Sequence, residues 1–297
     1  MQQMMMAGGT WTDPTGQDEY LVDGTYSWTC PAGIYSVSVV TVGAGAKGGN
    51  GGNGYPGGSG GGALRYKNNI SVTPGTSYTV VVGDGTADNN SYNDKTSYFI
   101  STGTVSAKGG YQNTASYGSN GSGGTQGTGT GGNGGNGGPG YEWFYSGSGG
   151  GAGGYSGTGG VGGRNYGNVA GGAGSGGGGG GGCMGGGGGV GLKGAGTSGA
   201  GALGYSASND TYWKRMGQGG SDGLNGGKQP LQVQRGSGGS YSGTANHAYQ
   251  TFDECGGECG GGTNGPNNQR GSDGGVRIIY PGNVRQFPST RTADENV

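Results

Sequence analysis

Glycine recurs at every third position in several separate tracts, and this period limits the possible folds more than any other feature of the chain. It holds this spacing from residue 48 to 60, from 151 to 163, from 176 to 194 and from 217 to 226, and residues 131–139 read GGN-GGN-GGP. A period of three matches the left-handed helix of the polyproline II type, which rises about 3.1 Å per residue. Because that helix has no internal hydrogen bonds, its backbone groups need partners on neighbouring chains.

Two known structures use such helices, and a flexible linker is the alternative to both. Collagen needs abundant proline, whereas this chain has 89 glycines but only 9 prolines in 297 residues. Ordering glycine is entropically costly, and each hydrogen bond returns only about 0.5–1.5 kcal/mol. A single tract is therefore expected to behave as a Gly/Ser linker, while several tracts packed together can fold. We predict a packed bundle of polyglycine II helices.

The apolar residues are concentrated in short stretches typical of β-strands. Leu, Ile, Val and Phe make up only 32 of the 297 residues, and thirteen of these lie in 34–42, 70–82 and 276–279. Residues 25–30 alternate, so that Tyr26, Trp28 and Cys30 share one face. Residues 70–82 contain the turn sequence Thr-Pro-Gly-Thr between two apolar runs and read as a hairpin. Residues 97–105 predict a further pair of strands.

These patterns predict an all-β fold combined with polyglycine II and essentially no α-helix. A small β-sandwich-like domain would be closed by a C-terminal strand, with the polyglycine II bundle inserted between its parts. The expected organisation is an N-terminal attachment segment (1–19), a β-rich part containing the first glycine tract (20–110, tract 48–62), a polyglycine II body with aromatic loops (111–274), a closing strand (275–281) and a C-terminal tail (282–297).

Composition argues against several classes of function. The formal net charge is −1, from 15 basic and 16 acidic residues, and this near-neutral balance argues against nucleic acid as a partner, because phosphate binding favours clustered Lys and Arg. No apolar stretch reaches the length of a membrane span, which predicts no membrane insertion. The start of the chain lacks the basic region of a secretory signal. His247 is the single histidine, and nothing pairs it with a nucleophile, so we expect no enzyme activity and no cofactor.

Metal binding is not expected either, although two segments raise the question. Cys255 and Cys259 could form a disulfide or bind a metal, but a zinc site needs four ligands and the chain offers few. The segment from Asp84 to Asp94 is rich in oxygen ligands, yet it lacks the spacing and final glutamate of an EF-hand loop. We interpret it as a polar hairpin loop.

Two segments, one near each end of the β-rich and glycine-rich part of the chain, resemble a known family. Residues 26–49, which read YSWTCPAGIYSVSVVTVGAGAKGG, look like the opening of the phage glycine-rich domain, and residues 274–281, GGVRIIYP, look like its closing strand. Residues 282–290 are similar to the ends of glycine-rich structural proteins of marine cyanobacterial phages. More distantly, the glycine tracts resemble the polyglycine II tail-fibre adhesins of T-even-like phages, although those lack the β-rich opening found here.

The resemblance implies a virion protein, made in the host cytoplasm, whose partners are other virion proteins and a host glycan or outer-membrane protein. A homo-oligomer is also compatible with it. Bulky insertions between the glycine tracts are the candidate contact residues, because exposed aromatic rings give large contact areas; alternatively, these rings cover the ends of the bundle or form contacts between subunits. The candidates are Tyr141, Trp143, Phe144, Tyr145, Tyr212, Trp213, Lys214, Arg215, Tyr241, Tyr249 and Phe252.

Two functions fit this picture. The first is a tail-fibre or tail-tip component that presents loops to the host surface. The second is a purely structural virion component, such as a head decoration, neck or baseplate part, that contacts only other virion proteins. The sequence does not decide between them, because both use the same loops in different surroundings.

Overall fold

The described residues of the chain form β-strands and extended segments, without a helix. The structure is a computed structural model that describes residues 14–48, 57–87, 94–112, 120–125, 127–140, 147–164, 169–181, 186–202, 220–221, 259–262 and 271–289. Within these ranges the strands are β1 (Gly16–Tyr20), β2 (Gly24–Thr29), β3 (Ser36–Val42), β4 (Leu64–Ser71), β5 (Ser77–Val82), β6 (Ser97–Phe99), β7 (Val105–Ala107), β8 (Gly127–Thr128) and β9 (Gly275–Tyr280).

These strands form two antiparallel sheets, which confirms the predicted all-β class. Sheet A has the order β1-β9-β3-β4, and sheet B has the order β2-β5-β6-β7-β8. A core of buried side chains from both sheets lies between them. Trp28 of sheet B is at its centre, with its ring centroid 5.7 Å from that of Phe99 and 6.2 Å from that of Tyr280 in sheet A. Tyr26, Trp28 and Cys30 therefore share one face of the chain, as predicted, and that face packs against this core.

The two inner strands of sheet A, β3 and β9, are buried on both faces, which explains why β3 is almost continuously apolar. Val37 and Val39 of β3 face sheet B, whereas Val40 and Val42 belong to a second core on the opposite face. That second core also contains Tyr155 from the glycine-rich region. Sheet A thus separates two cores, one inside the sandwich and one against the glycine-rich region.

The predicted hairpin at residues 70–82 is wrong. Its two strands are β4, which pairs with β3 in sheet A, and β5, which pairs with β2 in sheet B. The turn between them carries the chain from one sheet to the other. The turn residues are the same whether a turn closes a hairpin or connects two sheets, so the sequence could not show that the two apolar runs have different partners. The predicted pair within 97–105 is borne out in outline by β6 and β7, which pair antiparallel.

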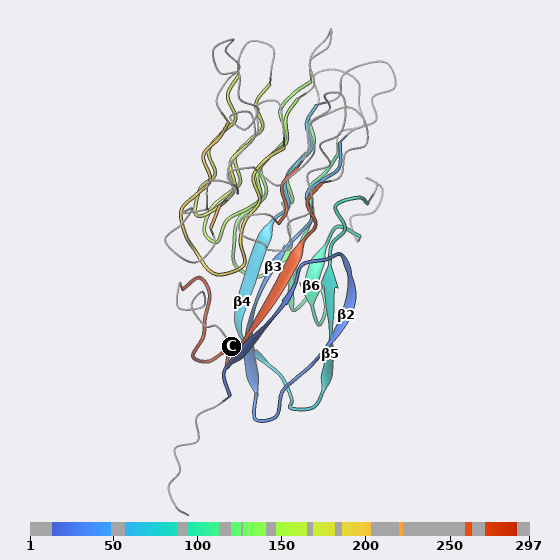
Figure 1. Cartoon of the computed structure of the whole chain (residues 1–297), viewed down its shortest axis with the longest axis vertical. Helices are drawn as coiled ribbons and strands as arrows, with labels where there is room; N and C mark the ends of the chain where they lie inside the picture. Colours follow the sequence, from blue (N-terminus) through green and yellow to red (C-terminus); the bar gives the residue numbers. More distant parts are fainter. Residues whose placement is uncertain are drawn as a thin grey trace, which may run out of the picture.

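The glycine-rich segments continue from the strands of sheet A and run alongside one another away from it (Figure 1). Residues 43–46 follow β3, residues 57–63 precede β4, and residues 271–274 precede β9. We call the described glycine-rich segments outside the strands, from residue 43 to 274, the glycine body.

Backbone hydrogen bonds cross the glycine body in rows spaced three residues apart. Four segments, 57–64, 131–139, 147–154 and 157–164, share three such rows. In each row an N–H group donates to the carbonyl of the next segment at an N···O distance of 2.7–3.2 Å. The row nearest the sheets joins Leu64, Gly132, Gly154 and Gly157; the middle row joins Gly61, Gly135, Gly151 and Gly160; and the outer row joins Gly58, Gly138, Ser148 and Gly163.

A single segment bonds to different neighbours through different positions of its three-residue repeat. In segment 131–139, Gly135 donates to segment 147–154, whereas Gly134 donates to Gly124 at 3.0 Å. Asn133 accepts a bond of 2.9 Å from Gly159 on another side. A β-strand bonds to neighbours on two sides only. Bonding in several directions makes the glycine body a three-dimensional packing of chains rather than a third sheet.

Close approach of the backbones is what excludes larger residues at the inner positions. A Cβ atom placed on Gly135 would overlap the carbonyl oxygen of Gly160, and one on Gly61 would overlap that of Gly151. The two Asn residues of the GGN repeats at 131–136 lie toward the surface instead, with Asn133 half-buried and Asn136 exposed. The period of three therefore separates inner glycines from outer polar residues.

Replacing an inner glycine is expected to destabilise the protein strongly. Gly135→Ala should lower the free energy of unfolding by about 1–3 kcal/mol, because the added methyl group forces two hydrogen-bonded backbones apart. The matched control is Gly103→Ala in the turn between β6 and β7, where the nearest atom to an added Cβ is 3.7 Å away. Urea unfolding followed by circular dichroism measures both, and the control should stay within about 0.5 kcal/mol. Equal stability of the two variants would contradict the close-packed arrangement.

Tyr155 links the glycine body to sheet A. Its side chain is fully buried, and its ring stacks on Phe287 with centroids 6.0 Å apart. The hydroxyl group donates to the carbonyl of Gly191 at 3.1 Å and accepts from the N–H of Gly194 at 3.0 Å. Burial raises the pKa of Tyr155 well above the ordinary tyrosine value of 10.0. The ring fills the second core while its hydroxyl group satisfies two backbone groups.

We expect stability to fall above pH 10 partly because of Tyr155. Its folded-state pKa is raised, so its contribution is complete below the unfolded value of about 10 and is lost as the pH rises beyond it. The loss should approach about 1.4 kcal/mol per pH unit. In Tyr155→Phe this part of the slope should disappear, and stability at pH 7 should fall by about 1–3 kcal/mol because two buried backbone groups lose their partner. Urea midpoints at pH 7 to 11 measure both effects, and identical slopes would contradict them.

Both ends of the described chain are attached to sheet A. Strand β1 begins at Gly16, inside the segment 1–19 that was expected to serve attachment, and it pairs with β9. In the expected C-terminal tail, Phe287 is buried and its backbone bonds to the side chain of Asn68 at 2.7 and 2.9 Å. Arg277 of β9, which is fully buried, lies 3.0 Å from Glu19 of β1. Residues 16–20 and 282–289 are thus part of the folded domain.

Candidate functional site

The predicted contact residues lie outside the described part of the chain. They belong to three segments, residues 141–146, 203–219 and 222–258. The residues concerned are Tyr141, Trp143, Phe144, Tyr145, Tyr212, Trp213, Lys214, Arg215, Tyr241, Tyr249 and Phe252. Their role as contact residues stays a prediction, and the described residues that flank them give the available structural information.

The flanks of the first segment lie at the end of the glycine body away from the sheets. Gly138, just before residues 141–146, donates to the carbonyl of Ser148, just after them, at 2.7 Å. This bond belongs to the outer row of the glycine body, whereas Leu64 and Gly132 are in the row next to the sheets. Ala202, which precedes residues 203–219, bonds to Gly181 at 2.9 Å near the same end.

The third segment leaves the glycine body elsewhere. Ser221 and Cys259 flank residues 222–258, and both bond to the same short stretch: Ser221 accepts from Gly191 at 2.6 Å, and Cys259 accepts from Val190 at 3.0 Å. Val190 is part of the second core against sheet A. The described structure therefore groups both flanks of residues 141–146 at the outer end and places those of residues 222–258 beside the sheets. Residues 203–219 have one flank of each kind, because Gly220, which follows them, donates to the carbonyl of Gly189 at 2.8 Å, next to Val190.

Cys259 is buried and packs in the second core beside sheet A. Cys255, its predicted partner in a disulfide, lies outside the described residues. The disulfide therefore stays a prediction.

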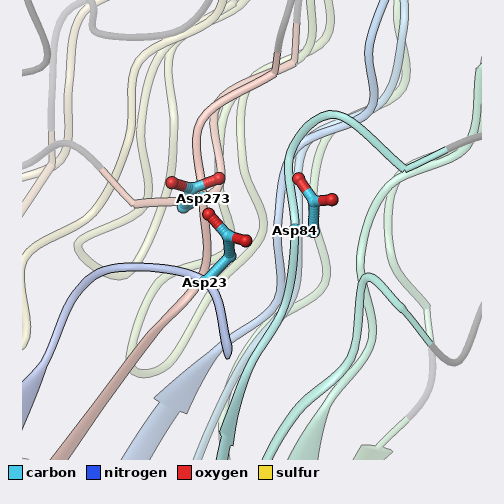
Figure 2. Close-up of side chains that lie close together, drawn as sticks. All are labelled: Asp23, Asp84 and Asp273. Atoms are coloured by element: carbon cyan, nitrogen blue, oxygen red, sulfur yellow. The ribbon is translucent and has the colours of Figure 1, made fainter. Parts of the chain in front are cut away.

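Three carboxylates that are distant in sequence meet where sheet A enters the glycine body. Asp23 lies in the turn between β1 and β2, Asp84 follows β5, and Asp273 precedes β9 (Figure 2). One carboxylate oxygen of each lies within 4.8 Å of the others. Asp84 accepts bonds of 2.6 Å from the backbone N–H and the hydroxyl group of Thr86, and Asp273 accepts one of 3.0 Å from the N–H of Gly85. These bonds fix the orientation of two of the three side chains.

A hollow of about 480 Å³ lies beside this cluster on the outer face of sheet B. Asp23 and Asp84 line it together with Asp94, so three carboxylates border one concave surface. The half-buried ring of Tyr98 in β6 and the hydroxyl groups of several threonines complete its wall. The residues that line the hollow are Asp23, Gly24, Thr25, Val81, Val82, Asp84, Asp94, Thr96, Tyr98 and Thr102.

The sequence pointed to part of this site and missed the rest. The segment from Asp84 to Asp94 was singled out for its oxygen-rich composition, and both of its end residues line the hollow. Asp23 and Asp273 were not selected, because they lie 61 residues before and 189 residues after Asp84. The pairing of β2 with β5 places Gly24 opposite Val82, and the pairing of β1 with β9 places Tyr20 opposite Val276; together they bring these positions close to one another. Carboxylates of this kind can hold a cation or accept hydrogen bonds from a polar ligand.

No protein-family model matches the chain, and no curated protein sequence matches it. Among the described residues there is no helix long and apolar enough to cross a membrane.

Proposed function

We propose that the chain is a non-enzymatic virion protein of a tailed phage, a tail-fibre or tail-tip component whose glycine body presents loops for recognition of the host surface. The resemblance of residues 26–49 and 274–281 to the phage glycine-rich domain gives the virion assignment. The outer row of the glycine body is the observation that carries the presentation role, because the flanks of residues 141–146 meet there. Catalysis has no part in this proposal.

The glycine body in this proposal is a packed polyglycine II bundle, inserted in a small β-sandwich that β9 closes as its last strand. Rows of hydrogen bonds spaced three residues apart support it, since a threefold helix returns each position to the same side every three residues. Bonding of segment 131–139 to several neighbours supports it further. Such a bundle is a stiff support, because each segment is held from several sides.

The threefold helix is tested by deletions that keep or break its phase. Removing residues 134–136, one complete Gly-Gly-Asn repeat, moves the rest of the segment by one row and leaves inner positions occupied by glycine. Removing Gly135 alone places Asn136 and Pro139 at inner positions, where a Cβ atom has no room.

We expect the three-residue deletion to retain a cooperative thermal transition. The single deletion should lower the melting temperature much further, although it removes less of the chain. Differential scanning calorimetry of the two variants beside the unmodified protein measures this. A single deletion that is as stable as the triple one would contradict the period-three packing.

The position of the chain in the particle tests the function. Antibodies raised against the full chain and detected by immunogold electron microscopy on purified particles should label the fibre or tail tip. Labelling of the head, neck or sheath would instead support the purely structural role. Unlabelled particles would overturn the virion assignment, provided that the antibodies bind the denatured chain extracted from the same particles.

A further inference from the structure

The hollow on sheet B has a size, a charge and an aromatic wall that together favour one kind of ligand. It is formed by three separate stretches: the turn after β1, the end of β5, and the chain from Asp94 through β6 to Thr102. Its volume of about 480 Å³ lies within the usual range for small-ligand sites, about 300–1,000 Å³. The concave surface therefore has room for a side chain or a small molecule.

The charge of the hollow favours a cationic ligand. Among the described residues, its lining contains three carboxylates and no Lys, Arg or His. Carboxylates gathered around a concave surface concentrate negative potential there, so a cation gains more from entering than a neutral group does. The bonds from Thr86 hold the Asp84 carboxylate in place, so this acceptor is already oriented before a ligand arrives.

The uncharged part of the wall favours an organic cation over a single metal ion. Tyr98 contributes a half-buried aromatic ring, and Val81 contributes an apolar surface beside it. A metal ion uses neither, whereas a guanidinium group stacks on an aromatic face and forms two parallel hydrogen bonds with a carboxylate. Arginine fits this combination better than lysine, because its donors lie in one plane.

We propose that the hollow receives an arginine side chain of a partner protein, held between the carboxylates of Asp84 and Asp94 and the ring of Tyr98. The site lies on the sandwich and is separate from the outer end of the glycine body. It does not depend on the recognition role proposed above.

Solution NMR of the full-length ¹⁵N-labelled chain tests this directly. The probe is Nα-acetyl-L-arginine amide, and its control is the citrulline analogue, which has nearly the same shape but no charge. We expect the arginine probe to shift the amide signals of Thr25, Thr96 and Tyr98 in a saturable manner. The citrulline analogue should shift them much less at the same concentration. Equal shifts with both probes would overturn the proposal, whatever the behaviour of any variant.

Substitutions then locate the charge that matters. Asp94→Asn should weaken binding of the arginine probe about two- to fivefold, as expected for a partly exposed ion pair. Asp18→Asn removes one negative charge from strand β1 outside the hollow, and it should leave the affinity unchanged. Equal weakening by both variants would show a general charge effect and overturn the assignment. Calcium chloride that shifts the same signals and blocks the probe would make the hollow a metal site and overturn it too.

Discussion

Glycine backbones pack so closely that no side chain fits between them, and the rest of the structure depends on this constraint. Each hydrogen bond between glycine segments contributes only about 0.5–1.5 kcal/mol, while fixing a residue costs about 1–2 kcal/mol in backbone entropy. A pair of segments would therefore not remain associated. Segment 131–139 becomes ordered because it bonds to several neighbours at once, and those neighbours bond to one another. Stability of the glycine body is thus collective, and one inner side chain disturbs several segments.

Sheet A provides the starting point for this packing. Strands β3, β4 and β9 are adjacent in the sheet, and the glycine segments that extend them leave it already aligned. Arg65 of β4 strengthens the junction by donating to the carbonyl of Gly132 at 2.6 Å and to the side chain of Asn133 at 2.6 Å. Burial lowers the pKa of Arg65, and its bonds to Gly132 and Asn133 offset the cost of desolvating the cation. The sandwich and the glycine body consequently stabilise each other.

The strands could be predicted from the sequence to the extent that their patterns are local. Alternation around Trp28 and the apolar run of β3 identify strands directly, because a pleated strand places every second side chain on one face. The hairpin prediction at 70–82 failed because a turn does not show which sheet each arm joins. Tyr155 was not predicted for a related reason: its neighbours Gly154 and Ser156 are typical of an exposed tract, and it is buried by residues distant in sequence, such as Phe287 and Tyr66.

The acidic hollow could be predicted only in part for the same reason, because its residues are distant in sequence. Asp84 and Asp94 stand close enough in sequence to be read as one loop, but Asp23, which also lines the hollow, precedes β2 and comes next to Asp84 only through the pairing of β2 with β5. The three carboxylates around this hollow repel one another, which is an electrostatic cost to the fold. The described part of the glycine body contains few charged side chains, among them Lys47, Arg164 and Lys193. The two proposals therefore divide between the two parts of the fold: arginine binding is proposed for the sandwich, and presentation of loops for the glycine body.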